Sequence, residues 1–124
     1  MFSSNFICLN VEKKSSFMQP ITLQEFKKLL LDPDKLQIID VRSKEEHFDK
    51  RIRGGKNIPL DELFSHAPNL NHSKNIVVHC AHGFRAKRAA EYLEKVCHLH
   101  VYYLKGDIEN WEHMDLPVLY GDET

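Results

Sequence analysis

The chain alternates between two hydrophobic patterns, one with the period of a helix and one typical of buried strands. Short apolar runs rich in β-branched residues at positions 36–41, 76–79 and 101–104 predict strands buried on both faces. A shorter extended piece at 57–59 predicts an edge strand, because Pro59 cannot donate a hydrogen bond to a neighbouring strand. Helical patterns stand between these runs. We therefore predict an α/β fold with a mostly parallel sheet flanked by helices.

Two helices can be placed from the residues at their starts. Thr22 and Glu25 have the spacing of a capping box, and the helix that they open ends before Pro33. A second helix begins near Arg85, because small and apolar residues then recur at helical spacing: Ala86, Ala89, Ala90, Leu93 and Val96. Its N-terminus would point back toward Cys80.

The chain length of 124 residues predicts one domain, which we place at residues 18–120, between an N-terminal extension (1–17) and a polar C-terminal tail (121–124). The net charge of -1 argues against nucleic acid or an anionic membrane as a partner. No apolar run approaches the roughly 18 residues of a membrane span. The odd number of cysteines, three, favours reduced thiols and a cytoplasmic location over a secreted disulfide framework.

Cys80 stands where the predicted strand 76–79 runs into a short loop that contains Gly83 and leads into the second helix. Free N–H groups at a helix start and in a tight turn attract anions, and a thiolate or a persulfide is an anion. The helix dipole supplies only about 0.3–2 kcal/mol, so loop amides or a cation, Arg85 or His82, must add to it. The alternative is an inert thiol buried in the core.

Three separated segments together resemble the rhodanese domains. In the first segment, IIDVRSKEEHFDKRIRGGKNIP, a strand continues into Asp-Val-Arg, an acidic pair and a Gly-rich stretch that ends in Asn-Ile-Pro. The second segment, CAHGFRA, is similar to the active-site loop of the family, and the third, LKGDIENWEHMDLPV, to its closing segment. The resemblance implies a three-layer domain with a parallel sheet of about five strands. It places Cys80 at the C-terminal end of a central strand, where ligand sites of open α/β sheets tend to lie.

The activity implied by the resemblance is sulfur transfer, with Cys80 as nucleophile and persulfide carrier. The substrate-binding loop would comprise Ala81, His82, Gly83, Phe84 and Arg85, with Arg85 either orienting an anionic donor, holding the loop closed or forming a surface salt bridge. The donor would be a small anion such as thiosulfate, and the acceptor cyanide or a thiol. No cofactor is required, and no metal site is expected, because the histidines and cysteines lack the paired spacing of a zinc site.

The sequence departs from the family pattern in two segments. Lys50 and Arg51 replace a Gly-His pair and Arg53 is added, so Arg51 and Arg53 would steer anions if they lie near the pocket, and otherwise form a solvated basic surface. Asp107 replaces the second glycine of the closing segment.

Asp40 and Arg42 are interpreted as structural rather than catalytic, with Arg42 paired to an acidic residue such as Glu46. Trp111 and Phe48 are predicted to lie in the core.

Two alternatives to an enzyme that turns over thiosulfate remain. One is a rhodanese-like module that carries sulfur for a partner protein, or docks on it, with little turnover of its own. The other, less favoured, is a cysteine phosphatase or arsenate reductase. Those enzymes place five residues between cysteine and arginine, whereas four separate Cys80 from Arg85 here, which favours sulfane sulfur over a larger oxyanion.

Overall fold

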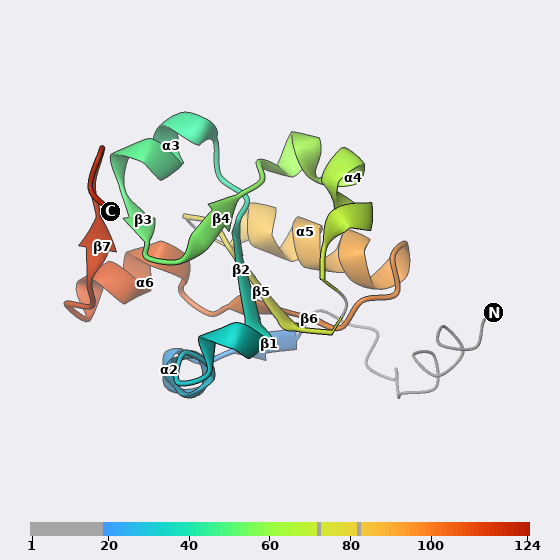
Figure 1. Ribbon diagram of the computed structural model, residues 1–124, viewed down its shortest axis with the longest axis horizontal. Coiled ribbons are helices and arrows are strands. Elements are labelled where there is room, and N and C mark those ends of the chain that lie inside the picture. The colour runs from blue at the N-terminus through green and yellow to red at the C-terminus, as the bar shows by residue number, and fades with distance from the viewer. Residues whose placement is uncertain (1–18, 72, 82) are drawn as a thin grey trace.

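A five-stranded parallel sheet lies at the centre of the computed structural model, which describes residues 19–71, 73–81 and 83–124 (Figure 1). The strand order is β1-β6-β5-β2-β4, and every neighbouring pair is parallel. The strands are β1 (Gln19–Ile21), β2 (Leu36–Asp40), β4 (Gly55–Asn57), β5 (Asn75–His79) and β6 (Val101–Leu104). The predicted α/β fold is therefore confirmed.

The predicted strands differ from the observed ones by a few residues. The edge strand β4 spans Gly55–Asn57 rather than 57–59, although the pairing with β2 continues past its end, where the Ile58 N–H donates to the Asp40 carbonyl at 2.9 Å. Pro59 follows, and it lacks the N–H that would extend the ladder. The N-terminal extension predicted at 1–17 lies outside the described residues.

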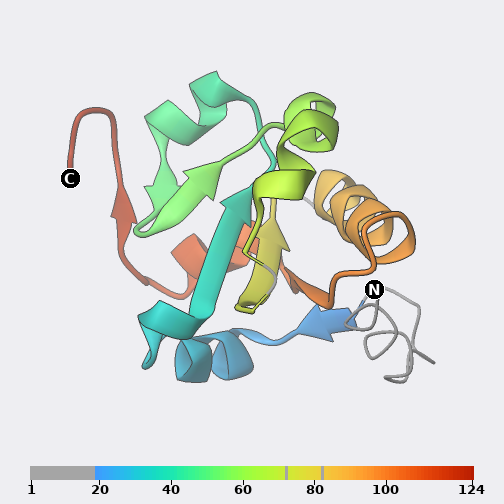
Figure 2. The same ribbon diagram turned by 45° about the vertical axis from the view of Figure 1, so that its right-hand side comes forward.

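Helices cover both faces of the sheet, which gives three layers (Figures 1 and 2). One core cluster joins the sheet to α4 (Leu63–His66) and α5 (Phe84–Lys95), and the other joins it to α2 (Leu23–Leu29) and α6 (Asp107–His113). Successive strand residues face opposite sides, so Val78 of β5 packs in the first cluster and Val77 in the second. This double burial explains why the strands read as continuous apolar runs.

Three short 3-10 turns link these elements: η2 (Pro33–Lys35), η3 (Leu60–Glu62) and η4 (Ala67–Asn69). The capping box predicted from Thr22 and Glu25 opens α2, and an equivalent box from Ser43 and Glu46 opens α3 (Lys44–Asp49). Each box satisfies N–H groups that have no partner inside the helix. No helix in the described part of the chain is long and apolar enough to cross a membrane.

Of the two aromatic residues predicted to lie in the core, one is buried and the other is exposed. Trp111 is 5% exposed, and its ring meets the edge of Phe26 with the centroids 5.6 Å apart. The prediction for Phe48 is wrong, because its side chain is 55% exposed on α3, a helix that buries none of its residues.

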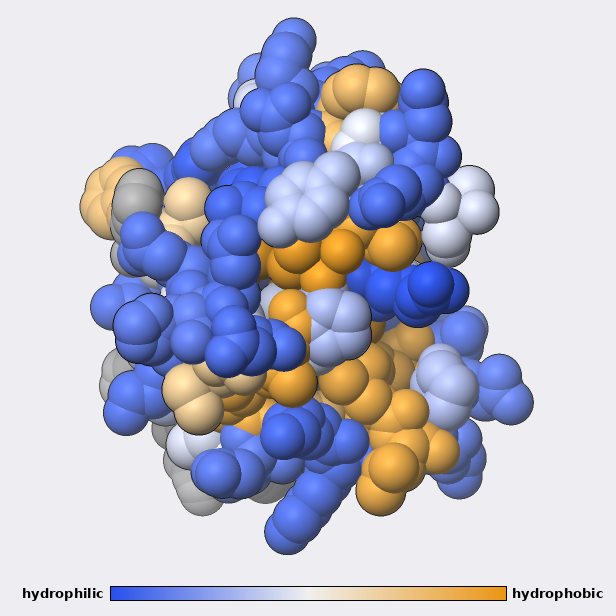
Figure 3. Space-filling view, turned by 90° about the vertical axis from the view of Figure 1, so that its left-hand side faces the viewer, coloured by the Kyte–Doolittle hydropathy of each residue, from blue (hydrophilic) through white to orange (hydrophobic). Residues whose placement is uncertain are grey.

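The chain closes with a small second sheet, in which β3 (Arg51–Ile52) pairs antiparallel with β7 (Val118–Leu119). Beyond β7, the Gly121 N–H donates to the Phe48 carbonyl at 2.7 Å, so the tail at 121–124 lies against the end of α3. On this side of the molecule, apolar side chains reach the surface in a band between hydrophilic rims (Figure 3).

Candidate active site around Cys80

Cys80 is the first residue after β5, and it lies at the C-terminal edge of the sheet. Its side chain is buried, and the Sγ atom accepts hydrogen bonds from the N–H groups of Gly83 at 3.0 Å and Ala86 at 3.3 Å. Gly83 makes this geometry possible, because its φ of +93° lets the chain turn back and start α5 with its first amides aimed at the sulfur. Two N–H donors and a helix start favour the thiolate over the thiol.

The start of α6 holds the backbone of Cys80 through two hydrogen bonds. The Cys80 N–H donates to the Asp107 carboxylate at 2.7 Å, and the Ile108 N–H donates to the Cys80 carbonyl at 3.3 Å. Asp107 is 3% exposed and adopts a φ of +53°, in the left-handed region that glycine favours. The site therefore contains a buried carboxylate directly behind the loop.

Arg85 forms a bidentate ion pair with Glu46, with hydrogen bonds of 2.7 and 3.0 Å. The hydrogen bond from Arg85 is the main cause that lowers the pKa of Glu46 to about 2, and the same contact raises the pKa of Arg85. This geometry corrects the expectation that Glu46 pairs with Arg42. Glu46 caps α3, and the pairing with Arg85 holds that helix against the end of the Cys80 loop.

Arg42 pairs instead with Asp40, through Nε to Oδ1 at 2.9 Å and Nη2 to Oδ2 at 2.8 Å. His47 adds a contact from Nδ1 to Oδ2 at 2.7 Å. Burial alone would raise the pKa of Asp40, but the hydrogen bonds from Arg42 and His47, with nearby positive charge, lower it. Both members of the Asp40–Arg42 pair are almost fully buried, so removing either would leave an unpaired buried charge, and neither group faces a substrate.

His79 precedes Cys80 but does not take part in the sulfur cradle. Its register partner on β2 is Asp40, and strand alternation turns it to the face opposite that of the Cys80 side chain. Both ring nitrogens are buried without a hydrogen-bond partner in the described structure. Burial lowers the pKa of His79 to about 4, so its ring is neutral at neutral pH.

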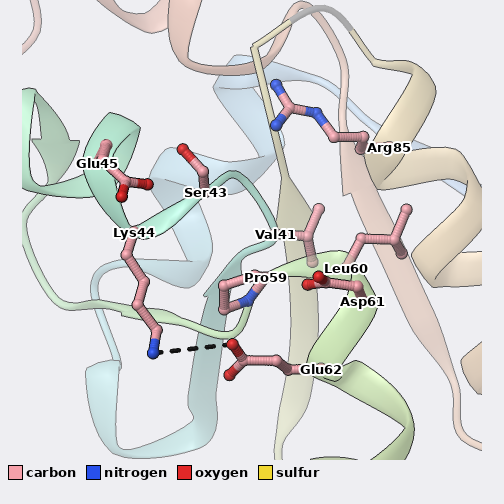
Figure 4. Close-up of a pocket in the computed structure, with 9 residues that line it drawn as sticks. All are labelled: Val41, Ser43, Lys44, Glu45, Pro59, Leu60, Asp61, Glu62 and Arg85. Carbon is pink, nitrogen blue, oxygen red and sulfur yellow. Dashed lines mark ion pairs between the residues drawn. The ribbon is translucent and has the colours of Figure 1, made fainter.

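An open pocket of about 500 Å³ lies beside Arg85 (Figure 4). Its apolar part comes from Val41, Pro59 and Leu60, which follow the C-terminal ends of β2 and β4. The two cations of its lining already have carboxylate partners, because Lys44 pairs with Glu62 at 3.7 Å and Arg85 with Glu46. The pocket therefore offers apolar contact and a rim in which both cations are paired and two further carboxylates, Glu45 and Asp61, also take part.

The other predicted loop residues occupy different surroundings. Phe84 is 69% exposed, and the guanidinium of Arg88 lies 5.3 Å from the centre of its ring. Ala81 lines a second pocket, together with Gly83 and Asp107. His82 lies outside the described residues.

The structure does not bring Arg51 and Arg53 to Cys80. Arg51 lies on β3, where its guanidinium donates to the carbonyls of Phe48 at 3.2 Å and Glu123 at 2.6 Å. Arg53 is exposed in the turn before β4, at the opposite end of that strand from the edge where Cys80 lies.

Cys97 lies beyond the far end of α5. The residue whose amide contacts the Cys80 sulfur, Ala86, is in the first turn of this helix, and a helical rise of 1.5 Å per residue puts Cys97 about 16 Å further along. A disulfide requires Cα atoms within about 7 Å. Burial raises the pKa of Cys97, so this thiol is also less ionised than an exposed one.

Three residues of the site escaped the sequence prediction in whole or in part. The sequence assigns Ala86 only to the helix, although a residue in the first turn of a helix after such a loop can also donate its amide to the site. The predicted partner of Glu46 is wrong, because separation in sequence does not reveal contacts between helices. Asp107 replaces a glycine of the family pattern, which indicates a left-handed backbone but does not show what the side chain contacts.

The sequence matches the family described as Rhodanese-like domain over residues 22–114. The chain therefore belongs to the rhodanese-like domain family, and the resemblance of its three motifs is confirmed. Its fold is similar to the crystal structure of a rhodanese-related protein from Thermoplasma volcanium, with a TM-score of 0.74 and 28% identity, covering 82% of this chain and 97% of that one.

Among curated proteins, the chain is 33% identical to the uncharacterized protein YqhL of Bacillus subtilis (strain 168), over 76% of this chain and 72% of that protein. It is 34% identical to the putative sulfur carrier protein YrkF of the same organism, over 67% of this chain and 45% of that protein. It is 24% identical to the thiosulfate sulfurtransferase GlpE of Glaesserella parasuis, over 82% of this chain and 93% of that protein. The chain thus spans less than half of the length of the putative sulfur carrier protein YrkF.

Proposed function

We propose that this protein is a sulfurtransferase that holds sulfane sulfur as a persulfide on Cys80. The observation that carries the proposal is the buried Sγ atom, which accepts two backbone N–H groups at the start of α5. These donors stabilise negative charge on Sγ, both in the thiolate that attacks the donor and in the thiolate that leaves when the persulfide is discharged. The names of the relatives, a thiosulfate sulfurtransferase and a putative sulfur carrier, support the same chemistry.

The reaction divides into two displacements at sulfur. The Cys80 thiolate attacks the outer sulfur of thiosulfate, a new S–S bond forms, and the old S–S bond breaks as sulfite leaves with the electron pair. Cyanide or a thiolate then attacks the terminal sulfur of the persulfide and regenerates the Cys80 thiolate. Neither step needs an oxidant, a metal or an organic cofactor. Both need a reduced thiol, which fits a reducing compartment such as the cytoplasm.

Intact-mass measurement after thiosulfate treatment tests the proposal. We expect a gain of about 32 Da, the mass of one sulfur atom, that cyanide removes as thiocyanate. Cys80→Ser should abolish the gain, whereas the matched variant Cys97→Ser should retain it, since Cys97 lies at the other end of α5. A wild-type protein that gains no cyanide-labile sulfur would contradict the proposal.

A second candidate is a sulfur carrier that is loaded once and discharges to a partner protein. The exposed Phe84 beside the loop and the relative named as a putative sulfur carrier favour it. The two candidates differ in turnover. Repeated thiocyanate release from excess thiosulfate and cyanide would identify the enzyme, and a single equivalent of labile sulfur without multiple turnovers would identify the carrier.

Phosphate or arsenate chemistry is less well supported by the same contacts. An oxyanion would need a free guanidinium at the end of the loop, and Arg85 is bound in bidentate fashion by Glu46.

A further inference from the structure

Asp107 has an environment that is unusual for an acidic side chain. It stands where the closing segment of the family pattern has its second glycine, and its φ of +53° is unfavourable for most residues with a side chain. Its carboxylate is buried, with Oδ1 accepting the N–H of Cys80 at 2.7 Å. The side chain thus contacts the reactive residue itself.

The second carboxylate oxygen lies against the far end of the same loop. A Cβ atom added to Gly83 would lie 3.3 Å from Asp107 Oδ2, closer than an ordinary van der Waals contact. Gly83 is also the residue whose N–H donates to the Cys80 sulfur. One carboxylate therefore packs against both ends of the turn that holds the sulfur.

This arrangement has an electrostatic consequence. The N–H of Cys80 donates its hydrogen bond to Asp107 and not to the sulfur. The carboxylate therefore contacts the backbone of the same residue that carries the reactive Sγ atom. The amides of Gly83 and Ala86 attract negative charge to the sulfur, whereas the Asp107 carboxylate opposes it. The Coulomb repulsion grows in proportion to the charge of an approaching ligand.

We propose that Asp107 is a positioning residue for Cys80 and that it selects against doubly charged sulfur donors. A dianion such as thiosulfate experiences twice the repulsion of a monoanion that delivers the same sulfane sulfur. Arg85 and Lys44 are already paired with carboxylates. Lys87 and Lys105, which line the pocket beside Asp107, offset only part of this repulsion, and they act equally in the wild type and in any variant of Asp107. The inference rests on the proposed persulfide chemistry and adds the preferred charge of the donor.

Thiosulfate and methanethiosulfonate form a matched pair of probes. In each, the Cys80 thiolate bonds to the outer sulfur and the S–S bond of the donor breaks, so that sulfite or methanesulfinate leaves with the electron pair. The total charge stays at three negative units for the first reaction and two for the second. The ratio of kcat/KM for the two donors, with cyanide as acceptor, therefore reports on charge selection.

Asp107→Asn is the decisive variant. Asparagine keeps an oxygen that can accept the Cys80 N–H, and it tolerates the left-handed backbone, but it removes the negative charge. We expect the ratio of kcat/KM for thiosulfate over methanethiosulfonate to rise about three- to tenfold at low ionic strength. The pH profile for alkylation of Cys80 by the neutral reagent iodoacetamide should shift to lower pH, which a merely structural contact would not produce.

Asp115→Asn is the matched control, because Asp115 is exposed after α6, also has a left-handed φ of +60°, and loses the same formal charge in the same substitution. Its ratio should stay within about twofold of the wild-type value. Asp107→Gly suits the backbone and provides a second test should the asparagine variant fail to fold. It should raise the ratio as asparagine does and lower kcat for methanethiosulfonate, because the hold on Cys80 is lost.

The outcomes separate this inference from the function on which it rests. An unchanged donor ratio in both Asp107 variants, with persulfide still forming on Cys80, would overturn the role of Asp107 alone. A wild-type protein that accepts sulfur from neither donor would overturn the proposed function, and the role of Asp107 with it.

Discussion

Glu46 and Arg85 lie 39 positions apart in the chain and are joined by two hydrogen bonds of 2.7 and 3.0 Å. Glu46 belongs to the first turn of α3, and Arg85 to the first turn of α5, directly after the Cys80 loop. The pair therefore ties the end of the loop to a helix that packs elsewhere. The Arg85 guanidinium therefore uses its hydrogen bonds to hold the end of the loop and not to bind a substrate.

Replacing Glu46 by Gln should loosen this anchor. Glutamine can still cap α3, but it loses the charge-assisted pairing with Arg85, so we expect the rate of persulfide formation on Cys80 to fall about threefold to tenfold. Stopped samples analysed by intact mass measure this rate. The matched control is Glu25→Gln, which changes the same capping position in α2, far from Cys80, and should leave the rate unaltered.

The same pair predicts how stability depends on pH. The folded pKa of Glu46, about 2, lies below its ordinary value of 4.5, so the pair stabilises the fold fully above about pH 5 and is lost as the pH falls toward 2. Because the Glu46 side chain is 38% exposed, we expect a contribution of about 1 kcal/mol or less. Urea unfolding of wild type and Glu46→Gln should therefore differ at pH 7 and converge near pH 2, and a constant difference would contradict the assignment.

Gly83→Ala should impair the site more than it impairs the fold. The φ of +93° disfavours alanine, and its Cβ would meet the Asp107 carboxylate, so the Gly83 N–H would move from the sulfur. We expect a loss of about 1–2 kcal/mol of stability and at least about a tenfold loss of persulfide formation.

Gly54→Ala separates these two effects. Gly54 has a similar φ of +88°, but a Cβ there meets nothing within 4 Å. This variant should lose a similar amount of stability and keep its sulfur chemistry. Equal losses of activity in both variants would show that general strain, rather than the cradle, is responsible.

His79 should make the protein sensitive to mild acid. Its folded pKa of about 4 lies below the ordinary 6.5, so the unfolded chain binds a proton more readily, and stability falls as the pH drops from about 6.5 to 4. The loss is about 3 kcal/mol over this interval. His79→Val, which suits a buried strand, should flatten the slope measured by urea unfolding, whereas the exposed His113→Gln should not. An unchanged slope in His79→Val would refute this assignment.

Arg53→Ala tests anion steering by the basic segment. Because Arg53 lies at the end of β4 opposite to Cys80, we expect its removal to leave KM for thiosulfate unchanged at low as at high ionic strength, whereas a rise of about twofold confined to low salt would show steering from a distance. Arg51→Ala should in addition release the tail, because Arg51 binds the carbonyl of Glu123. An unchanged KM for both variants at low salt would discard the steering role.

Local patterns were sufficient to predict much of the fold. The strand at 101–104 matches β6 residue for residue, and the Thr22–Glu25 capping box forms as predicted, because both depend on neighbours in sequence. The exposure of Phe48 could not be predicted in this way. A single aromatic residue in a short helix gives no period from which to find its buried face, and only the position of α3 in the fold decides it.

The site shows the same division between local and long-range features. Cys80, Gly83 and the start of α5 could be read together, since a strand, a turn and a helix follow one another without a break. Glu46 and Asp107 reach the loop from α3 and α6, so their contacts depend on how distant helices pack. Replacement of glycine at position 107 was the one sequence signal of such a contact.

The length of α5 bears on how sulfur held on Cys80 in the proposed chemistry would leave. Cys97 lies a full helix away from Cys80, so neither of the two described thiols can attack the other's sulfur, and a disulfide between these two cannot discharge a loaded molecule. As far as the described thiols are concerned, unloading then requires a bimolecular collision with an outside nucleophile. The lifetime of the loaded protein would consequently depend on the supply of that nucleophile in its surroundings.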